Sequence, residues 1–366
     1  MAESFCHFLA EKVRVPAGGS FGDYLGPGSR GSVFMAPTSP KEVEKICQDL
    51  DPSKGPGHDD FSPSIVRSVA AEISVPLSRL INVCLEVGHF PDYLKVARIT
   101  PVFKAGDPTQ FGNYRPISVL SVFSKVFERV IQGRFVGFFE RQGHILGSQY
   151  GFRRGHSTNM AIMDMVENIR KAWENGDQCL GIFIDFKKAF DTVDHSILIS
   201  KLEHMGVRGP SLELIKSYFK NRKQYVVFNG AESSHHEITV GVPQGSILGP
   251  LFFLLYINDL SRSSMFFKYI LFADDTNIFA SGKTKRALYK KVRGELGKLS
   301  DWFAHNKLSL NYSKTEFIDF SKPAVGSSAH NFTLNIDGKK LRRVNESKFL
   351  GVLIDSKISW QGHILQ

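Results

Sequence analysis

The sequence predicts an α+β protein in which helices pack on a largely antiparallel sheet. Apolar residues recur at helical spacing in several segments, and the short apolar run at residues 179–186 is typical of a buried strand. Turn signals between strand-like runs, such as Asp337 followed by Gly338, predict β-hairpins. With 42% hydrophobic and 12% aromatic residues among 366, the chain has enough apolar material for a sizeable core.

Helices are expected in six segments. The first begins at Ser39 and Pro40, because serine caps a helix and proline suits its first turn. Further helices are expected at residues 63–87, in a segment after Ser118, at residues 194–205 and at residues 210–219. The last helix is amphipathic, with an apolar face formed by Leu288, Val292, Leu296, Leu299 and Phe303. Its outer face is basic and consists of Lys285, Arg286, Lys290 and Arg293.

Strands are expected at residues 179–186 and as a pair around residues 225–228 and 237–240. Residues 268–280 contain two apolar arms around Asp274 and Asp275, which predicts a β-hairpin with acidic residues at its tip. Residues 1–35 are expected to form a flexible leader and ordered structure to begin near Ser39, because residues 16–40 are rich in Gly, Pro and Ser.

Composition limits the partners and the compartment. The net charge of +10 favours a polyanionic partner such as nucleic acid, although charge alone leaves an ordinary basic protein equally open. The four scattered cysteines suit a reducing, intracellular compartment, and we expect neither a signal peptide nor a membrane span. No histidine pattern typical of zinc sites is found, so zinc is not expected and His235 with His236 is interpreted as a loop.

Three aspartates interrupt apolar strands. Asp185 ends one predicted strand, where a buried charge is costly without a partner, and Asp274 and Asp275 interrupt the predicted hairpin. Taken separately, Asp185 could cap the following turn and the pair could be an ordinary polar turn. Side chains alternate along a strand, so neighbouring aspartates point to one place only where the backbone turns, as it does at a hairpin tip. If Asp185 lies on the adjacent strand, three carboxylates converge.

Such a cluster favours divalent cations. Two carboxylates about 4 Å apart repel each other by roughly 4 kcal/mol at an effective dielectric constant of 20. Mg²⁺ is the natural choice of ion, because it is hard and prefers oxygen ligands, with Mn²⁺ as a possible substitute. Two ions about 3.5–4 Å apart would suit an in-line phosphoryl transfer by activating the attacking hydroxyl and stabilising the leaving oxygen.

Eight short motifs follow one another along the chain. The main ones are IDFKKAFD (184–191), GVPQGSILGPLFF (241–253) and FADD (272–275). The others are RITPVFKAGD (98–107), NYRPIS (113–118), QYGFRRGHST (149–158), LNYSKTEF (310–317) and KFLGV (348–352). In this order they resemble the reverse transcriptase family, and in particular the polymerases of non-LTR (LINE-type) retrotransposons, over about residues 36–360.

The resemblance implies a right-hand polymerase fold with an antiparallel palm sheet, packed helices and a mainly helical fingers subdomain. Residues 36–178 would form an N-terminal extension and the fingers, 179–347 the palm, and 348–366 a primer-grip-like strand, with the reverse transcriptase domain starting near residue 88. Family members usually continue into a helical thumb, so we expect a truncated chain with the thumb largely absent.

The same resemblance assigns roles to the catalytic residues. Asp185 and Asp274 would be the principal ligands of two Mg²⁺ ions, with Asp275 contributing less directly. Lys314 would protonate the pyrophosphate leaving group. KFLGV would form the hairpin that holds the primer, and Arg153 and Arg154 in QYGFRRGHST would suit contacts with a nucleic-acid strand.

Five further residues are implied to bind the nucleotide. Phe190 would exclude the ribose 2′-OH, and Gln244 and Gly245 would lie under the incoming nucleotide, where glycine allows close backbone approach. Lys104 and Arg115 would contact the triphosphate, since their positive charge suits phosphate oxygens.

The implied activity is RNA-directed DNA polymerisation, in which deoxynucleoside triphosphates are added to a primer 3′-OH. The implied partners are an RNA template and a DNA primer, with no membrane, while protein partners are not indicated. The expected location is intracellular, and the sequence does not decide between nucleus and cytoplasm. Two alternatives stay open: another templated polymerase such as an intron-encoded maturase, and a non-catalytic nucleic-acid-binding remnant.

Overall fold

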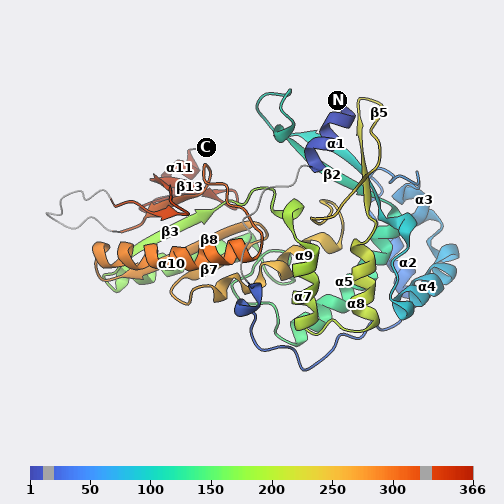
Figure 1. The fold of residues 1–366 in the computed structure, drawn as a ribbon, viewed down its shortest axis with the longest axis horizontal. Coiled ribbons are helices and arrows are strands. Elements are labelled where there is room, and N and C mark those ends of the chain that lie inside the picture. The colour runs from blue at the N-terminus through green and yellow to red at the C-terminus, as the bar shows by residue number, and fades with distance from the viewer. Residues whose placement is uncertain (11–19, 322–331, 366) are drawn as a thin grey trace. The chain divides into compact units, whose positions relative to one another are not determined.

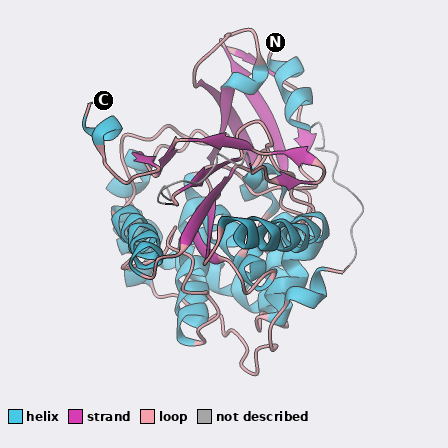
Figure 2. Cartoon of the chain, turned by 90° about the vertical axis from the view of Figure 1, so that its left-hand side faces the viewer, coloured by secondary structure: helices cyan, strands magenta, loops and turns pink. Residues whose placement is uncertain are grey.

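The computed structural model describes residues 1–10, 20–321 and 332–365, which form two compact units (Figure 1). Unit 1 contains the described parts of Met1–Arg14, Pro27–His144 and Phe190–Tyr256. Unit 2 contains those of Val15–Gly26, Ile145–Ala189 and Ile257–Gln366. Neither unit is one continuous stretch of sequence, and the boundaries of the fingers and palm stay predictions. Both units combine helices with sheets, so the predicted α+β class is confirmed (Figure 2).

Unit 1 is rich in helices. They are α1 (Ala2–Ala10), α2 (Pro40–Gln48), α3 (Pro63–Ser68), α4 (Ala70–Val87), α5 (Val122–Arg141), α7 (His195–His204), α8 (Pro210–Phe219) and α9 (Leu248–Tyr256). As predicted, Ser39 caps α2, its side chain accepting a hydrogen bond from the Glu42 N–H at 3.2 Å. The single helix predicted over residues 63–87 is wrong. Val69 leaves the helical conformation there (φ −111°, ψ 20°), a break for which we find no sequence signal.

The main sheet of unit 1 has the strand order β2–β1–β4–β5, and β6 also pairs with β4. Its strands are β1 (Val96–Phe103), β2 (Tyr114–Leu120), β4 (Lys223–Phe228), β5 (Ala231–Glu232) and β6 (His236–Glu237). β1 pairs with β2 antiparallel and with β4 parallel. The strand pair expected around residues 225–228 and 237–240 is only partly present, because β6 ends at Glu237 and pairs with Lys223 and Gln224, whereas Val227 and Phe228 pair with β5.

The expectation that ordered structure begins near Ser39 is wrong. Helix α1 lies in the predicted leader, and its residues Ala2, Phe5 and Cys6 are buried against the β1–β2–β4 sheet. These positions lie three or four residues apart at most, so they share one helix face that needs an apolar partner. Residues 11–19 of the predicted leader, and residue 366 at the other end, lie outside the described residues.

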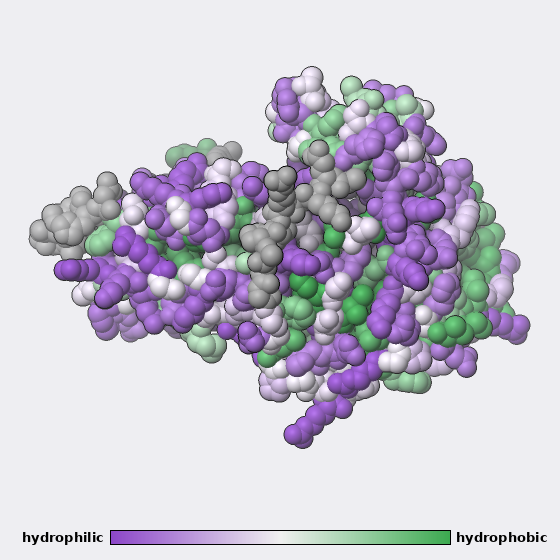
Figure 3. Space-filling view, viewed as in Figure 1, coloured by the Kyte–Doolittle hydropathy of each residue, from purple (hydrophilic) through white to green (hydrophobic). Residues whose placement is uncertain are grey.

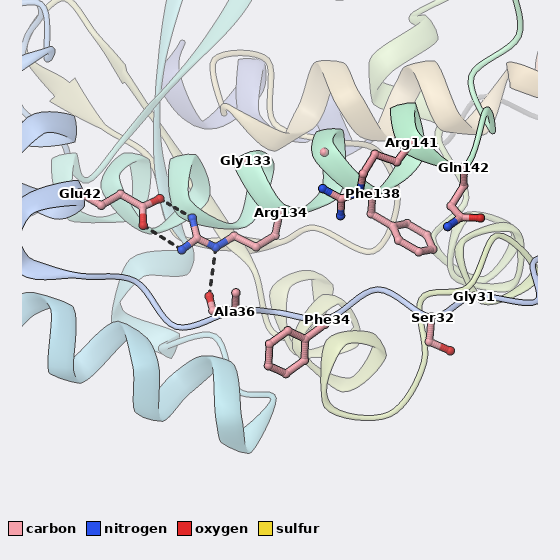
Figure 4. Close-up of a pocket in the computed structure, with 11 residues that line it drawn as sticks. Gly31, Ser32, Phe34, Ala36, Glu42, Gly133, Arg134, Phe138, Arg141 and Gln142 are labelled. Atoms are coloured by element: carbon pink, nitrogen blue, oxygen red, sulfur yellow. Dashed lines mark hydrogen bonds and ion pairs between the residues drawn. The ribbon is translucent and has the colours of Figure 1, made fainter.

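The later part of the leader is also built into unit 1. Val33 is buried, and its N–H donates to the Gly206 carbonyl at 2.9 Å. The Arg134 side chain on α5 donates to the Ala36 carbonyl at 3.1 Å and pairs with Glu42 (Figure 4). A groove of about 630 Å³ runs between this segment and α5 and contains none of the predicted site residues.

Unit 2 is built on a sheet with the strand order β12–β9–β3–β8–β7. The strands are β3 (Gln178–Ile184), β7 (Lys268–Phe272), β8 (Asp275–Gly282), β9 (Glu316–Asp319) and β12 (Arg342–Val344). Two further hairpins are β10 (Asn335–Ile336) with β11 (Lys339–Lys340), as predicted around Asp337, and β13 (Glu346–Phe349) with β14 (Val352–Asp355). The predicted hairpin at residues 268–280 is present as β7 and β8.

Helices cover both faces of this sheet. On one face, α6 (Thr158–Glu174) shares a core with alternate residues of β3, including Cys179 and Phe183. On the other, α10 (Lys285–His305) places Tyr289 against Phe317. The predicted basic outer face of α10 is exposed at Arg286, Lys290 and Arg293, where Figure 3 shows mainly hydrophilic residues. No helix within the described ranges is long and apolar enough to cross a membrane.

Candidate active site

Strand pairing in unit 2 brings Asp185 and Asp275 together. The antiparallel β3–β8 ladder ends with the pair Ile184 and Thr276, so Asp185 and Asp275 come next on the two strands. Directly opposite residues in such a ladder have Cα atoms about 4.5–5.5 Å apart. Residues 90 positions apart in the chain therefore lie side by side, as the three-carboxylate prediction requires.

A two-residue turn places Asp274 at the same end of the sheet. Phe272 pairs with Asp275, so only Ala273 and Asp274 connect β7 to β8. Ala273 has a φ of +56°, a left-handed value of the kind that two-residue hairpins need at their first central position. Asp274 is exposed at the tip, next to Asp275. The turn thus overcomes the alternation that would otherwise point the two aspartates to opposite faces.

The three carboxylates affect one another electrostatically. The pKa of Asp275 is raised to about 6, first because protein atoms reduce its hydration and then because the charges of Asp274 and Asp185 repel its own. Like charges at this range disfavour one another unless cations are added. The oxygen-only donor set and its excess negative charge fit Mg²⁺, which prefers carboxylate oxygens.

A loop before β9 holds Asp185 in place. The Asn311 side-chain amide donates to Asp185 Oδ2 at 2.8 Å, and the Asn311 N–H donates to the Asp185 carbonyl at 2.8 Å. The Asp185 N–H donates to Thr315 Oγ1 at 3.3 Å. Lys314 is exposed in the same turn, where its N–H donates to the Asn311 carbonyl at 3.1 Å. Lys314 and Asp185 are therefore both hydrogen-bonded to the backbone of Asn311. Asn311 lies in the LNYSKTEF match, but its contact with Asp185 was not predicted.

A second segment packs against the acidic hairpin. The Tyr150 N–H donates to the Leu271 carbonyl at 2.8 Å, which aligns residues 148–151 with β7. A Cβ atom at Gly151 would lie only 2.3 Å from the Ala273 nitrogen, so a side chain there would displace the turn. This contact explains the first of the two glycines in QYGFRRGHST.

The same motif carries the two predicted nucleic-acid contacts. Arg153 Nη1 donates to the carbonyls of Leu146 and Gln149 at 3.1 Å each, so its guanidinium stabilises the conformation of residues 146–153. Arg154 is exposed. Contacts of either arginine with nucleic acid stay a prediction.

The KFLGV segment forms the β13–β14 hairpin. Its turn residues Leu350 and Gly351 both have positive φ values (48° and 86°), as type I′ turns require. Phe349 is buried, and its ring lies 6.5 Å from that of Phe183, two residues before Asp185. The hairpin is therefore anchored on the strand that carries Asp185, and its primer-binding role stays a prediction.

Three of the predicted nucleotide-binding residues lie together in unit 1. The Phe190 carbonyl accepts a hydrogen bond from the Val242 N–H at 2.8 Å, and the Phe190 ring stacks on Phe253 with centroids 4.6 Å apart. The Gln244 side chain donates to Asp191 Oδ1 at 2.7 Å. The 190–192 turn and the 241–246 loop thus support each other.

Gly245 is required by its surroundings. Its φ is +130°, and a Cβ atom would lie 2.4 Å from the Ser118 carbonyl oxygen on β2. The Ser118 N–H donates to the Gln244 carbonyl at 2.8 Å, so β2 and the loop are in direct contact. Lys104 and Arg115 are both exposed at the end of the β1–β2 hairpin that the connecting loop closes, where Arg115 pairs with Val102.

A buried glutamate fixes the end of this loop, and sequence reasoning did not identify it. Glu128 on α5 is fully buried, and its Oε2 accepts hydrogen bonds from the N–H groups of Ile247 (2.7 Å) and Leu248 (3.1 Å) at the start of α9. Its Oε1 accepts from Ser124 Oγ at 3.1 Å. The only available signal was an acidic residue within the apolar stripe of the predicted helix.

Comparison with known proteins gives consistent matches. Residues 103–354 match the family described as reverse transcriptase (RNA-dependent DNA polymerase). A probable RNA-directed DNA polymerase from transposon X-element of Drosophila melanogaster is 31% identical over 336 residues, covering 90% of this chain and 36% of that protein. The RNA-directed DNA polymerase from mobile element jockey of the same organism is 28% identical over 351 residues, covering 93% and 38%. The chain spans about a third of the length of these relatives.

Proposed function

Because this chain belongs to the reverse transcriptase family, we propose that it is an RNA-directed DNA polymerase core that extends a DNA primer along an RNA template. The predicted likeness to non-LTR retrotransposon polymerases is confirmed at the level of the family. The observation that carries the proposed chemistry is the meeting of Asp185, Asp274 and Asp275 at one end of the unit 2 sheet.

In this proposal the residues of unit 2 carry out the chemistry. Asp185 and Asp274 would hold two Mg²⁺ ions, or Mn²⁺ as a substitute, and Asp275 would add negative charge beside them. When bound, such ions favour deprotonation of the primer 3′-OH and stabilise charge on the leaving pyrophosphate. Asn311 orients the Asp185 carboxylate by its 2.8 Å hydrogen bond. Lys314 protonates the pyrophosphate as it leaves.

The residues of unit 1 bind the deoxynucleoside triphosphate. The Phe190 ring, fixed by stacking on Phe253, excludes a ribose 2′-OH. Gln244 and Gly245 support the nucleotide, and hydrogen bonds with Glu128 and Ser118 fix the position of their loop. Lys104 and Arg115 contact the phosphates, for which exposed cations at the end of a hairpin are suited.

Primer extension tests the proposal. The purified chain is incubated with poly(rA)/oligo(dT) and dTTP, with and without Mg²⁺, and compared with its Asp274→Asn variant. We expect Mg²⁺-dependent addition of nucleotides by the parent chain only. Template–primer binding should be nearly the same in both proteins, because the substitution removes a metal ligand and no phosphate contact.

Two results would contradict parts of the proposal. Equal extension by the Asp274→Asn variant would remove the aspartate cluster from the chemistry. Binding of Mg²⁺ and template–primer by a folded parent chain without addition of even one nucleotide would favour the non-catalytic remnant instead.

A further inference from the structure

A second group of ligand-type side chains lies on unit 1, outside the proposed polymerase residues. Glu3 and His7 are one turn apart on α1, and His236 belongs to β6, where it pairs with Gln224 of β4. Glu3 Oε1 lies 3.4 Å from His7 Nε2 and 3.1 Å from His236 Nε2. One ligand atom from each of the three residues lies within 4.8 Å of the other two.

The fold explains why these three side chains meet. The apolar face of α1, formed by Ala2, Phe5 and Cys6, is buried against the sheet of unit 1. This contact fixes the rotation of α1 about its axis and leaves Glu3 and His7 beside the chain segment that leads into β6. Figure 1 shows α1 lying against the strands of this sheet.

A serine orients the carboxylate in advance. The Ser234 N–H donates to Glu3 Oε2 at 2.8 Å, and Ser234 Oγ donates to Glu3 Oε1 at 2.7 Å. These hydrogen bonds fix the orientation of the Glu3 carboxylate, which is ionised at neutral pH like an ordinary glutamate. A ligand that is already ionised and oriented loses less conformational freedom when an ion binds.

The distances fit a tetrahedral metal ion. Ligand bonds of about 2.0–2.1 Å at tetrahedral angles separate neighbouring donor atoms by roughly 3.3 Å. The two separations from Glu3 Oε1, 3.4 and 3.1 Å, lie on either side of this value, and the ligand nitrogens of the two histidines lie within 4.8 Å of each other. The side chains of His7, Glu3 and His236 are 65%, 47% and 23% exposed, which leaves a path for the ion and a fourth position for water.

We propose that Glu3, His7 and His236 bind a divalent first-row transition ion, zinc by preference, which ties α1 to the sheet of unit 1. Two imidazoles and one carboxylate suit zinc, whereas Mg²⁺ prefers oxygen ligands alone. This revises the expectation of no zinc site and of His235 and His236 as a plain loop. Sequence spacing could not indicate the site, because 233 positions separate Glu3 from His236.

Metal binding by the untagged full chain tests this proposal. Co²⁺ serves as the optical probe and Zn²⁺ as its competitor, with excess Mg²⁺ present so that the aspartate cluster does not contribute. The main variant is His7→Ala, because the 65% exposed His7 side chain contributes little to packing. The matched control is His235→Ala. The ring of His235 stacks on that of Tyr225, with centroids 4.8 Å apart, and does not belong to the cluster.

We expect one Co²⁺ equivalent with a tetrahedral absorption spectrum in the parent chain and in the His235→Ala control. Its affinity should fall at least about tenfold in His7→Ala and in His236→Gln, as expected for loss of a metal ligand. Zn²⁺ should raise the melting temperature of the parent and the control only. Absence of the absorption band in the parent, or equal affinity in parent and His7→Ala, would show a hydrogen-bonded cluster without metal and overturn the proposal. Neither readout depends on polymerase activity.

Discussion

The two ends of strand β3 handle negative charge in opposite ways. Near its start, Leu180 pairs with Asp319 of β9, whose side chain is only 2% exposed. Asp319 Oδ2 accepts hydrogen bonds from Lys285 Nζ and Arg343 Nη2, both at 3.1 Å. At this end of the strand, the chain supplies the cations that balance its own buried acid.

At the other end of β3, three acidic residues lie next to one another. Asp185 is held by the amide of Asn311 and the hydroxyl of Thr315, and its charge adds to those of Asp274 and Asp275. The pKa of Asp275 is raised there, first by reduced hydration and then by repulsion from Asp274 and Asp185. One sheet thus has a structural acid with internal counter-charges and an acidic cluster suited to external cations. The comparison separates an acid that the fold pairs with its own cations from acids that we propose to hold catalytic ions.

The sharpest test of this comparison is Asp185→Asn. Loss of a residue that only hydrogen-bonds to a metal ligand typically lowers metal affinity or activity by about 10–100-fold. Loss of a ligand itself should therefore reduce primer extension by more than about 100-fold. The melting temperature should stay the same or rise, because a repelling charge is removed. Extension rate and thermal unfolding are measured on the same preparation. A large fall in melting temperature would place Asp185 with the structural acids, and Asp301→Asn on the exposed face of α10 is the control.

Asn311→Ala tests whether Asp185 needs to be oriented. The amide touches Asp185 Oδ2 and would act only through it, so the expected loss of extension is about 10–100-fold. The Mg²⁺ concentration that gives half-maximal activity should rise, and added Mg²⁺ should recover part of the rate. An effect on thermal stability with an unchanged Mg²⁺ requirement would show that Asn311 only supports the loop.

Asp319→Asn tests the other end of β3, where the buried acid is paired with Lys285 and Arg343. Asparagine keeps one acceptor oxygen, but it removes the negative charge that Lys285 and Arg343 face and places an NH2 group where the Ser321 N–H needs an acceptor. We expect a cost of about 1–3 kcal/mol in the free energy of unfolding. Primer extension per folded molecule should be preserved. Urea unfolding gives the stability, and active-site titration gives the folded fraction. Loss of activity without loss of stability would contradict the division between the two ends.

The sequence indicated the acidic cluster at the Asp185 end of β3 better than it indicated the buried Asp319 near the other end. Apolar runs broken by Asp185 and by Asp274 with Asp275 are visible locally, because a charge in a buried strand is unusual. The hairpin, α10, the capped start of α2 and the extent of α7 were also predictable from nearby residues. These features depend on short-range rules of capping, periodicity and turns.

Features that depend on distant contacts were not predictable. The burial of Asp319 requires Arg343, the role of Glu128 requires the start of α9, and the place of α1 requires the sheet of unit 1. Glycine-rich composition suggested a mobile leader, yet composition does not show which apolar residues find a partner surface. Gly151 illustrates the same limit, since only the fold places Ala273 against it.

The smallest expected effect concerns Glu295 on α10, a second acid with internal cations. Its side chain accepts hydrogen bonds from Ser264 Oγ at 2.7 Å and Lys298 at 3.0 Å, and these, with Lys291, lower the pKa of Glu295 to about 2. A lowered pKa in the folded state means that the ionised form stabilises the protein above the unfolded value of about 4.5 and loses this effect as pH falls toward 2.

Glu295→Gln should therefore lower the free energy of unfolding by about 1 kcal/mol at pH 7, and the difference from the parent should persist down to about pH 5. Below about pH 4.5 the two proteins should converge, because the parent carboxylate becomes protonated as it unfolds. Urea unfolding of both proteins between pH 7 and pH 3 measures the difference. A gap that stays constant over this range would mean that hydrogen bonding rather than charge links Glu295 to Ser264. The contrast between internally balanced acids and the acidic cluster would then rest on Asp319 alone.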